Sequence, residues 1–164
     1  MLELLIAAAI IGTLALFATQ SFRKTAANVR VEEAKARAQM VSAASYRFVL
    51  DHPNATLGED PFSAAVRPAR RESCSPTTFT LQNLIDCGYL EYRQYAAEIR
   101  DHKADGDTFQ RNFVMSTSAD ASGKVSGDIC VRGSSAKILK HDNMHYCYTN
   151  GTYTGGYPYT DPIP

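Results

Sequence analysis

Four cysteines are the residues whose type and spacing most directly suggest chemistry in this sequence. They form two local pairs, Cys74 with Cys87 and Cys130 with Cys147, and none has the CxxC spacing of a zinc ribbon or a thioredoxin-like site. We therefore expect two disulfides. Because disulfides persist in oxidising compartments, we also expect the domain to lie outside the cytoplasm.

A second cluster, HDNMHYC, carries the residue types of metal ligands. His141 and His145 have the four-residue spacing of two ligands on a helix, and Cys147 follows them. A disulfide would remove Cys147 as a ligand and no fourth ligand is present nearby, so we predict no metal here.

Three carboxylates lie close together in DHKADGD without the spacing or the closing glutamate of an EF-hand: Asp101, Asp105 and Asp107. A solvated loop is the expected structure, and a calcium site at these residues stays an open alternative. No Ser-His-Asp, Cys-His or paired-carboxylate arrangement is supported by the sequence. We therefore predict neither an enzyme nor a cofactor.

Two triplets, at residues 54–56 and 150–152, match the N-glycosylation pattern, and a turn is expected at each. The chain of 164 residues is long enough for one domain with a hydrophobic core. Its 17 basic and 17 acidic residues give a formal net charge of zero, which argues against nucleic acid as the main partner.

A single carboxylate, Glu3, lies within an apolar run at the N-terminus, MLELLIAAAIIGTLALFA, and no residue from Leu4 to Ala18 is charged. A secretory signal peptide would begin with basic residues, whereas here the acid comes first and Arg23 and Lys24 follow the run. An ionised carboxylate is costly to bury in an apolar environment. Glu3 is therefore either tolerated near the chain end or is the reason that the segment exists.

The element that must position Glu3 is a long helix, because residues 22–50 contain neither Pro nor Gly. Small or apolar residues recur every three or four positions, with only Ser45 out of type. This series is Ala27, Val31, Ala34, Ala38, Val41 and Phe48. The charged residues mostly fall on the other faces: Arg30, Glu32, Glu33, Lys35 and Arg37. Pro53 is expected to end a helix of about 50 residues.

This combination resembles a known family. LELLIAAAIIGTLALFA is similar to the N-terminal motif of type IV pilins and of type II secretion pseudopilins, in which a lone glutamate precedes a long apolar run that continues into an amphipathic helix. Glu3 matches the family's glutamate, and Gly12 matches its helix-loosening glycine. The motif is similar to the class III N-terminal methylation motif, and within this family the resemblance favours a major type IV pilin.

Two features depart from the family pattern, the position of Glu3 and the residue Gln20. Glu3 stands two positions nearer the N-terminus than the family's glutamate, so we expect either two further residues ahead of Met1 or a different mature N-terminus. No basic leader ending in glycine is present, as expected after cleavage by prepilin peptidase. Gln20 replaces the proline that often interrupts the pilin helix, which favours a more continuous helix here.

The remaining residues predict a small globular head. We expect residues 61–76 to be a solvated loop and residues 78–90 to contain a short helix with Thr80 as its N-cap and Gly88 at its end. Strands are expected within residues 108–117, 125–133 and 144–150. The intervening ADASGK predicts a turn, SSAKILKH a helical turn, and GTYTGGYPYTDPIP a loop-like tail.

Together these elements predict an α+β fold, in which a long N-terminal α-helix packs on a small C-terminal antiparallel β-sheet. The resemblance implies the ladle shape of pilins. Residues 1–21 would form the transmembrane or filament-core half of the helix, residues 22–52 the amphipathic half that packs on the head, and residues 53–164 the head. The resemblance also implies that the Cys130–Cys147 disulfide bounds a loop exposed on the filament.

The resemblance implies a subunit that polymerises with identical copies into an extracellular type IV pilus, for adhesion, motility or DNA uptake. Before assembly its helix would hold it in the inner membrane with a periplasmic head, where prepilin peptidase and the pilus assembly machinery act. Glu3 would pair with the N-terminal amine of a neighbour. The alternatives are a pseudopilin of a type II secretion system and a membrane-anchored periplasmic binding module.

Overall fold

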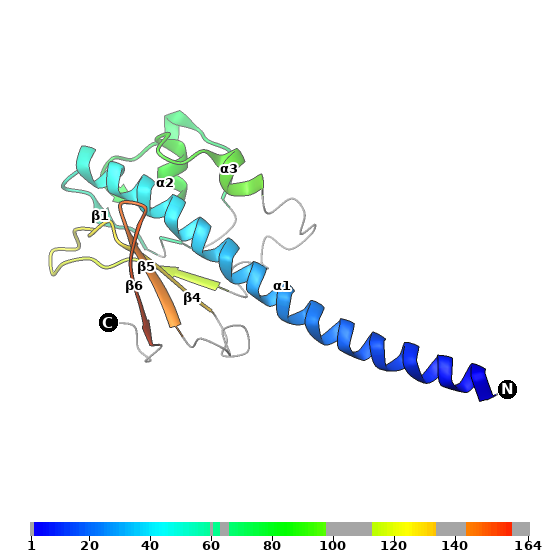
Figure 1. Cartoon of the computed structure of the whole chain (residues 1–164). Coiled ribbons are helices and arrows are strands. Elements are labelled where there is room, and N and C mark those ends of the chain that lie inside the picture. Colours follow the sequence, from blue (N-terminus) through cyan, green and yellow to red (C-terminus); the bar gives the residue numbers. More distant parts are fainter. Residues whose placement is uncertain (1, 60, 63–65, 98–112, 134–143, 159–164) are drawn as a thin grey trace. The chain divides into compact units, whose positions relative to one another are not determined.

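A computed structural model describes the chain except for residues 1, 60, 63–65, 98–112, 134–143 and 159–164 (Figure 1). The elements in chain order are α1 (Leu2–Asp51), β1 (Thr56–Leu57), the 3-10 helix η1 (Arg71–Ser73), β2 (Thr78–Phe79), α2 (Leu81–Asp86), α3 (Tyr92–Ala97), β3 (Phe113–Ser116), β4 (Ile129–Gly133), β5 (Met144–Thr149) and β6 (Thr152–Pro158).

The chain divides into two compact units, Met1–Glu33 and Ala34–Pro164. Helix α1, which has 50 residues, contributes to both. It ends at Asp51, two residues before Pro53, because a residue that precedes proline is biased away from the helical region. Pro53 is thus the stop that the sequence predicts.

In the second unit, α1 buries a face of mostly small residues: Ala34, Ala38, Val41, Ala44 and Phe48. This face includes the predicted apolar positions of residues 34–48. Ser45 on this face is also fully buried. Its hydroxyl donates a hydrogen bond to the carbonyl of Val41 one turn earlier, so burial leaves no unsatisfied polar group. Small side chains allow other parts of the chain to approach the helix closely.

The main sheet has four antiparallel strands in the order β3-β4-β5-β6 (Figure 1). Phe113 and Met115 of β3 are buried, as are Ile129 and Val131 of β4. These alternating positions share one face, since Met115 pairs directly with Val131. The mixture of helix with an antiparallel sheet confirms the predicted α+β class at that level.

The prediction of a loop-like C-terminal tail is wrong for residues 152–158, which form β6 and pair with β5. Asn150 and Gly151 join the two strands with φ angles of 51° and 72°. Positive φ at both central residues defines the two-residue type I′ hairpin turn, for which Asn-Gly is the preferred sequence. The Asn-Gly turn therefore determines the strand pairing of this segment, although its glycines and proline would favour a loop.

Helix α2 begins and ends as predicted. The Thr80 hydroxyl accepts a hydrogen bond from the Asn83 amide at 3.1 Å, which is N-capping geometry. Gly88 follows the helix with a φ of 84°, the left-handed conformation that glycine adopts without strain.

The connector before α2 is a solvated loop that hydrogen bonds anchor to the helix. Asp86 is 1% exposed, and its carboxylate accepts hydrogen bonds from Arg67 Nη2 at 3.0 Å, from the Arg70 amide at 2.7 Å and from Gln82 Nε2 at 3.0 Å. Gln82 Oε1 also accepts from the Arg67 amide at 2.8 Å. A buried carboxylate needs such partners, so residues 67–70 are fixed against α2. The predicted solvated loop is confirmed for residues 68–70, which are exposed and form neither helix nor strand, whereas residues 71–73 form the exposed 3-10 helix η1.

A charged residue of α1 lies on the buried face, which corrects the expected position of Arg37. Its side chain is 4% exposed, and its guanidinium carbon lies 6.0 Å from the ring centroid of Tyr95 in α3, a cation–π distance. Burial raises the pKa of Tyr95, and the positive charge of Arg37 opposes that rise. The Tyr95 ring is therefore a favourable partner for the buried guanidinium of Arg37.

Candidate assembly surface

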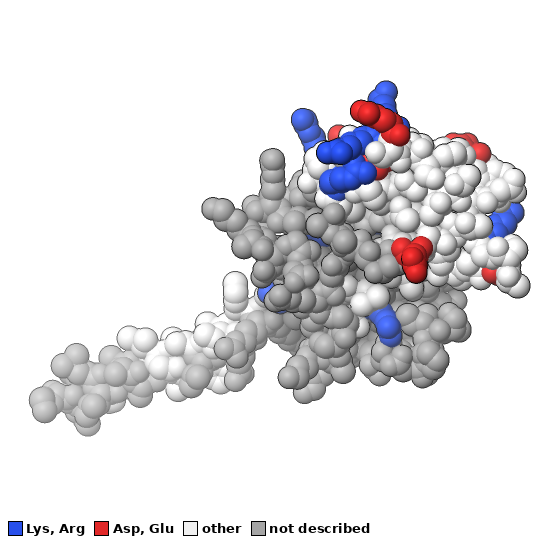
Figure 2. Space-filling model, turned by 180° about the vertical axis from the view of Figure 1, so that it is seen from behind, with Lys and Arg blue, Asp and Glu red and all other residues white. Residues whose placement is uncertain are grey.

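The first unit carries large apolar side chains on the outside of α1. Those that are more than half exposed are Ile6, Ile10, Ile11, Leu14, Phe17, Phe22 and Val29. On the face shown in Figure 2, the described atoms towards the N-terminal end belong to uncharged residues. Soluble monomers rarely expose large contiguous apolar patches, and such patches mark sites of interaction with proteins or membranes.

These side chains cover a broad sector of the helix, and because no residue from Leu4 to Ala18 is charged, the uncharged surface of this segment extends to every side. Ile6, Ile10 and Leu14 follow one another at the spacing of one helical face, and Ile11 and Phe22 widen this sector. A helix that is apolar on several sides is typical of a segment buried all round. We therefore take this part of α1 as the candidate assembly surface.

The polar group within the apolar run is satisfied locally, because the Thr13 hydroxyl donates to the carbonyl of Ile10 at 2.9 Å. Among the helices that the structure describes, none is both long and apolar enough to cross a membrane.

The two predicted assembly residues both lie in α1. The side chain of Glu3 falls outside the described residues, so its pairing with an amine stays a prediction. Gly12 is exposed, and a Cβ built on it would meet no atom within 4 Å beyond its neighbours and the adjacent helical backbone. The backbone is α-helical at Gly12 and at Gln20. Close packing within the chain therefore does not require a glycine at position 12.

Both predicted disulfides are confirmed in the second unit, Cys74–Cys87 and Cys130–Cys147. The first joins the connector to the residue that follows α2. The second joins residues that stand directly opposite each other in β4 and β5. The head is therefore cross-linked both around α2 and within the main sheet.

The candidate metal ligands are only partly described. His141 and the three aspartates, Asp101, Asp105 and Asp107, lie outside the described residues. His145 is buried in strand β5, so the helical spacing expected for the histidine pair does not apply to it. In the part of the chain that the structure describes, no group of three His, Cys, Asp or Glu side chains is placed to hold a metal ion.

The asparagines of the two glycosylation triplets both lie in turns, as predicted. Asn54 belongs to a turn in which the Ala55 amide donates to the carbonyl of His52 at 3.0 Å. Asn150 belongs to the hairpin turn between β5 and β6. Both asparagines are exposed.

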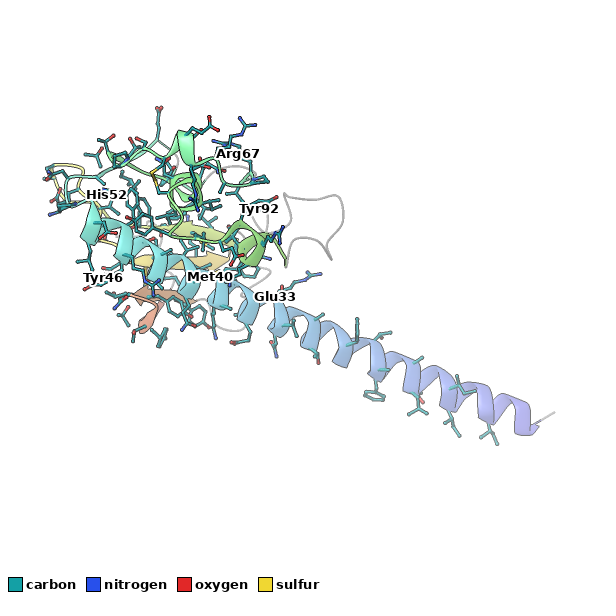
Figure 3. The ribbon with its side chains drawn as sticks, turned by 90° about the horizontal axis from the view of Figure 1, so that it is seen from above. Glu33, Met40, Tyr46, His52, Arg67 and Tyr92 are labelled. Carbon is teal, nitrogen blue, oxygen red and sulfur yellow. A yellow bond between two sulfur atoms is a disulfide. The ribbon has the colours of Figure 1, made fainter. Side chains whose placement is uncertain are left out.

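A polar cluster at the C-terminal end of α1 was not predicted from the sequence; Figure 3 marks it by His52. Tyr89 Oη donates to Asp51 Oδ2 at 2.7 Å and lies 3.3 Å from His52 Nε2. Desolvation, together with the hydrogen bond to Asp51 and its negative charge, raises the pKa of Tyr89 to about 12. A tyrosine that retains its proton so strongly acts as a hydrogen-bond donor and not as a base.

Comparison with known proteins gives no relative: no family model, no curated protein and no solved structure matches this chain.

Proposed function

We propose that this chain is the structural subunit of an extracellular helical filament of the type IV pilus kind. The observation that carries the proposal is the exposure of large apolar side chains along the first unit of α1. The described buried apolar residues all belong to the second unit, which therefore has a core of its own. A head with its own core and a helix with exposed apolar side chains are expected of a subunit whose helix is buried by other copies of the same chain.

In the proposed filament, the first units of many copies pack side by side. Burial of a large aliphatic or aromatic side chain contributes about 1.5–3 kcal/mol relative to exposure to water. Transfer from lipid provides much less, so close packing of small residues then decides the association. Gly12 supports this arrangement, because it is exposed and lets the backbone of a neighbouring helix approach.

Glu3 has a specific role in this proposal. An ionised carboxylate among apolar helices costs several kcal/mol unless a positive charge pairs with it. The N-terminal amine of a neighbouring subunit would provide that charge. Since only one axial position brings the two groups together, Glu3 would set the register of each incoming subunit.

The two disulfides support an extracytoplasmic location for the head. Within the second unit, the antiparallel sheet and its part of α1 are compatible with a pilin head. Before assembly, the same helix would hold the subunit at the inner membrane. Adhesion, motility and DNA uptake all remain compatible with such a filament.

The test is to count filaments sheared from cells that express the wild type or Glu3→Ala. We expect Glu3→Ala to be produced with both disulfides formed, and its filament yield to fall at least about tenfold because register pairing is lost. Glu72→Ala, which removes an exposed carboxylate of the head, is the matched control and should assemble normally. Wild-type filament yield from Glu3→Ala would contradict the assigned role of Glu3.

The abundance of the chain in sheared material separates the proposal from its alternatives. A major pilin should be the dominant protein of the filaments seen by cryo-electron microscopy. Trace amounts, together with a secretion defect on deletion, would instead identify a pseudopilin. A purified chain that stays monomeric, and whose deletion leaves pili intact, would identify a binding module.

A further inference from the structure

The turn between β5 and β6 rests directly on α1 within the second unit. The Gly151 amide donates to Ser42 Oγ at 3.2 Å, and the Ser42 hydroxyl donates to the carbonyl of Tyr148 at 2.8 Å. Ser42 is fully buried, and a Cβ built on Gly151 would lie 3.0 Å from the Cβ of Ala43. The Gly151 amide is therefore held inside the contact between the turn and the helix.

Asn150, which precedes this amide, has an exposed side chain. In an Asn-Gly pair, the glycine nitrogen can lose its proton and attack Cγ of the asparagine. The new N–Cγ bond closes a succinimide ring, and the side-chain nitrogen leaves as ammonia. Water then opens the ring at one of its two carbonyls, which gives aspartate or isoaspartate. Glycine favours the first step because it has no Cβ to hinder the nitrogen.

The docked turn opposes the first step of this reaction. The Gly151 N–H is donated to Ser42, and Asn150 and Gly151 are fixed at φ angles of 51° and 72°. Ring closure requires the nitrogen to leave Ser42 and to approach Cγ of Asn150. Such a local opening does not require the whole head to unfold.

We propose that Asn150 is a deamidation site whose reactivity is controlled by the docking of its turn on α1 through Ser42. Both products add a negative charge to a chain whose formal net charge is zero. Isoaspartate also adds a methylene to the backbone, which the two-residue turn between Thr149 and Thr152 does not accommodate. The isoaspartate product thus prevents the turn from docking again, whereas the aspartate product retains the Asp-Gly sequence that the turn accepts.

The test follows the peptide that contains Asn150 by mass spectrometry while the purified full chain is incubated at mildly alkaline pH. We expect native wild-type protein to react at least about tenfold more slowly than the same chain in denaturant. Ser42→Ala should react about tenfold faster than the native wild type, because it removes both buried hydrogen bonds of the contact. Ser75→Ala, which lies away from the turn, is the control and should react at the wild-type rate.

Equal rates for the native and the denatured wild-type chain would overturn the proposal. So would a Ser42→Ala variant that is folded by circular dichroism and still reacts at the wild-type rate. If Ser42→Ala does not fold, the ratio of native to denatured rates in the wild type decides. Asn150→Gln must abolish the mass change, because glutamine does not form the five-membered ring.

Discussion

Tyr89 illustrates how a single hydroxyl joins the end of α1 to the segment after α2. Its Oη donates to Asp51, whose carboxylate lies at the helix C-terminus, where the helix dipole disfavours a negative charge. The hydrogen bond therefore offsets an unfavourable position of Asp51. This hydrogen bond also makes the free energy of unfolding depend on pH in the alkaline range.

The direction of this dependence follows from the pKa of Tyr89, which rises from a usual value of 10.0 to about 12 on folding. The folded state holds the proton more tightly, so the stabilisation is fully present below pH 10 and is lost as the pH rises towards 12. We expect Tyr89→Phe to destabilise the head at neutral pH by about 1 kcal/mol, the value of a partly exposed hydrogen bond. It should also remove this alkaline loss.

Urea unfolding of the wild type, Tyr89→Phe and Tyr153→Phe across this pH range measures both effects. Tyr153 is 52% exposed and serves as the control, which should follow the wild type. Parallel pH profiles for the wild type and Tyr89→Phe would show that Tyr89 does not cause the alkaline loss.

At the scale of elements, α1 is approached closely by two glycine-containing segments of the head. A Cβ built on Gly127 would lie 3.7 Å from the Cα of Tyr46, and one built on Gly151 would lie 3.0 Å from the Cβ of Ala43. The first distance is ordinary contact, whereas the second is too close without movement. The hairpin is therefore the segment whose fit to α1 depends most on the absence of a side chain.

Comparing Gly151→Ala with Gly88→Ala separates the steric effect of a new Cβ against α1 from the strain of a positive φ angle. Both glycines have positive φ, 72° and 84°, but a Cβ on Gly88 would meet nothing within 4 Å. We expect Gly88→Ala to cost about 1–2 kcal/mol from the left-handed conformation alone. Gly151→Ala should cost about 1–3 kcal/mol more, because the helix and the hairpin must move apart. Equal losses in urea unfolding would mean that the contact with Ala43 relaxes freely.

At the scale of the whole molecule, the described core and both disulfides belong to the second unit. We therefore expect a chain of residues 34–164 to fold without residues 1–33. Its near-ultraviolet circular dichroism and its free energy of unfolding should match those of the full chain, while filament assembly should be lost. A fragment that is unfolded, or that loses much of its stability, would show that the first unit supports the head.

The features that were predictable from the sequence depend on a few neighbouring residues. The cap at Thr80, the stop at Gly88 and the β6 turn at Asn150-Gly151 are all local, although the tail's composition concealed the last of these. The two local cysteine pairs were likewise visible from their spacing. The apolar run was equally clear, but which of its side chains remain uncovered depends on the rest of the fold.

The features that were not predictable depend on partners far along the chain. Arg37 is buried with its guanidinium over the ring of Tyr95, and nothing near Arg37 in the sequence indicates that ring. Asp86 is buried because the connector residues Arg67 and Arg70 supply its donors. In each case a charged residue in an amphipathic pattern would be placed in solvent, and a distant partner reverses that preference.

The Cys130–Cys147 bond also determines how the head responds to mechanical force. It joins opposite residues of β4 and β5, and it is closed over a sequence separation of 17. When the chain is pulled by its ends, the tension crosses from β4 to β5 through the two sulfur atoms. The residues between the cysteines are shielded from the load, so the head can lengthen only through segments outside that covalent loop.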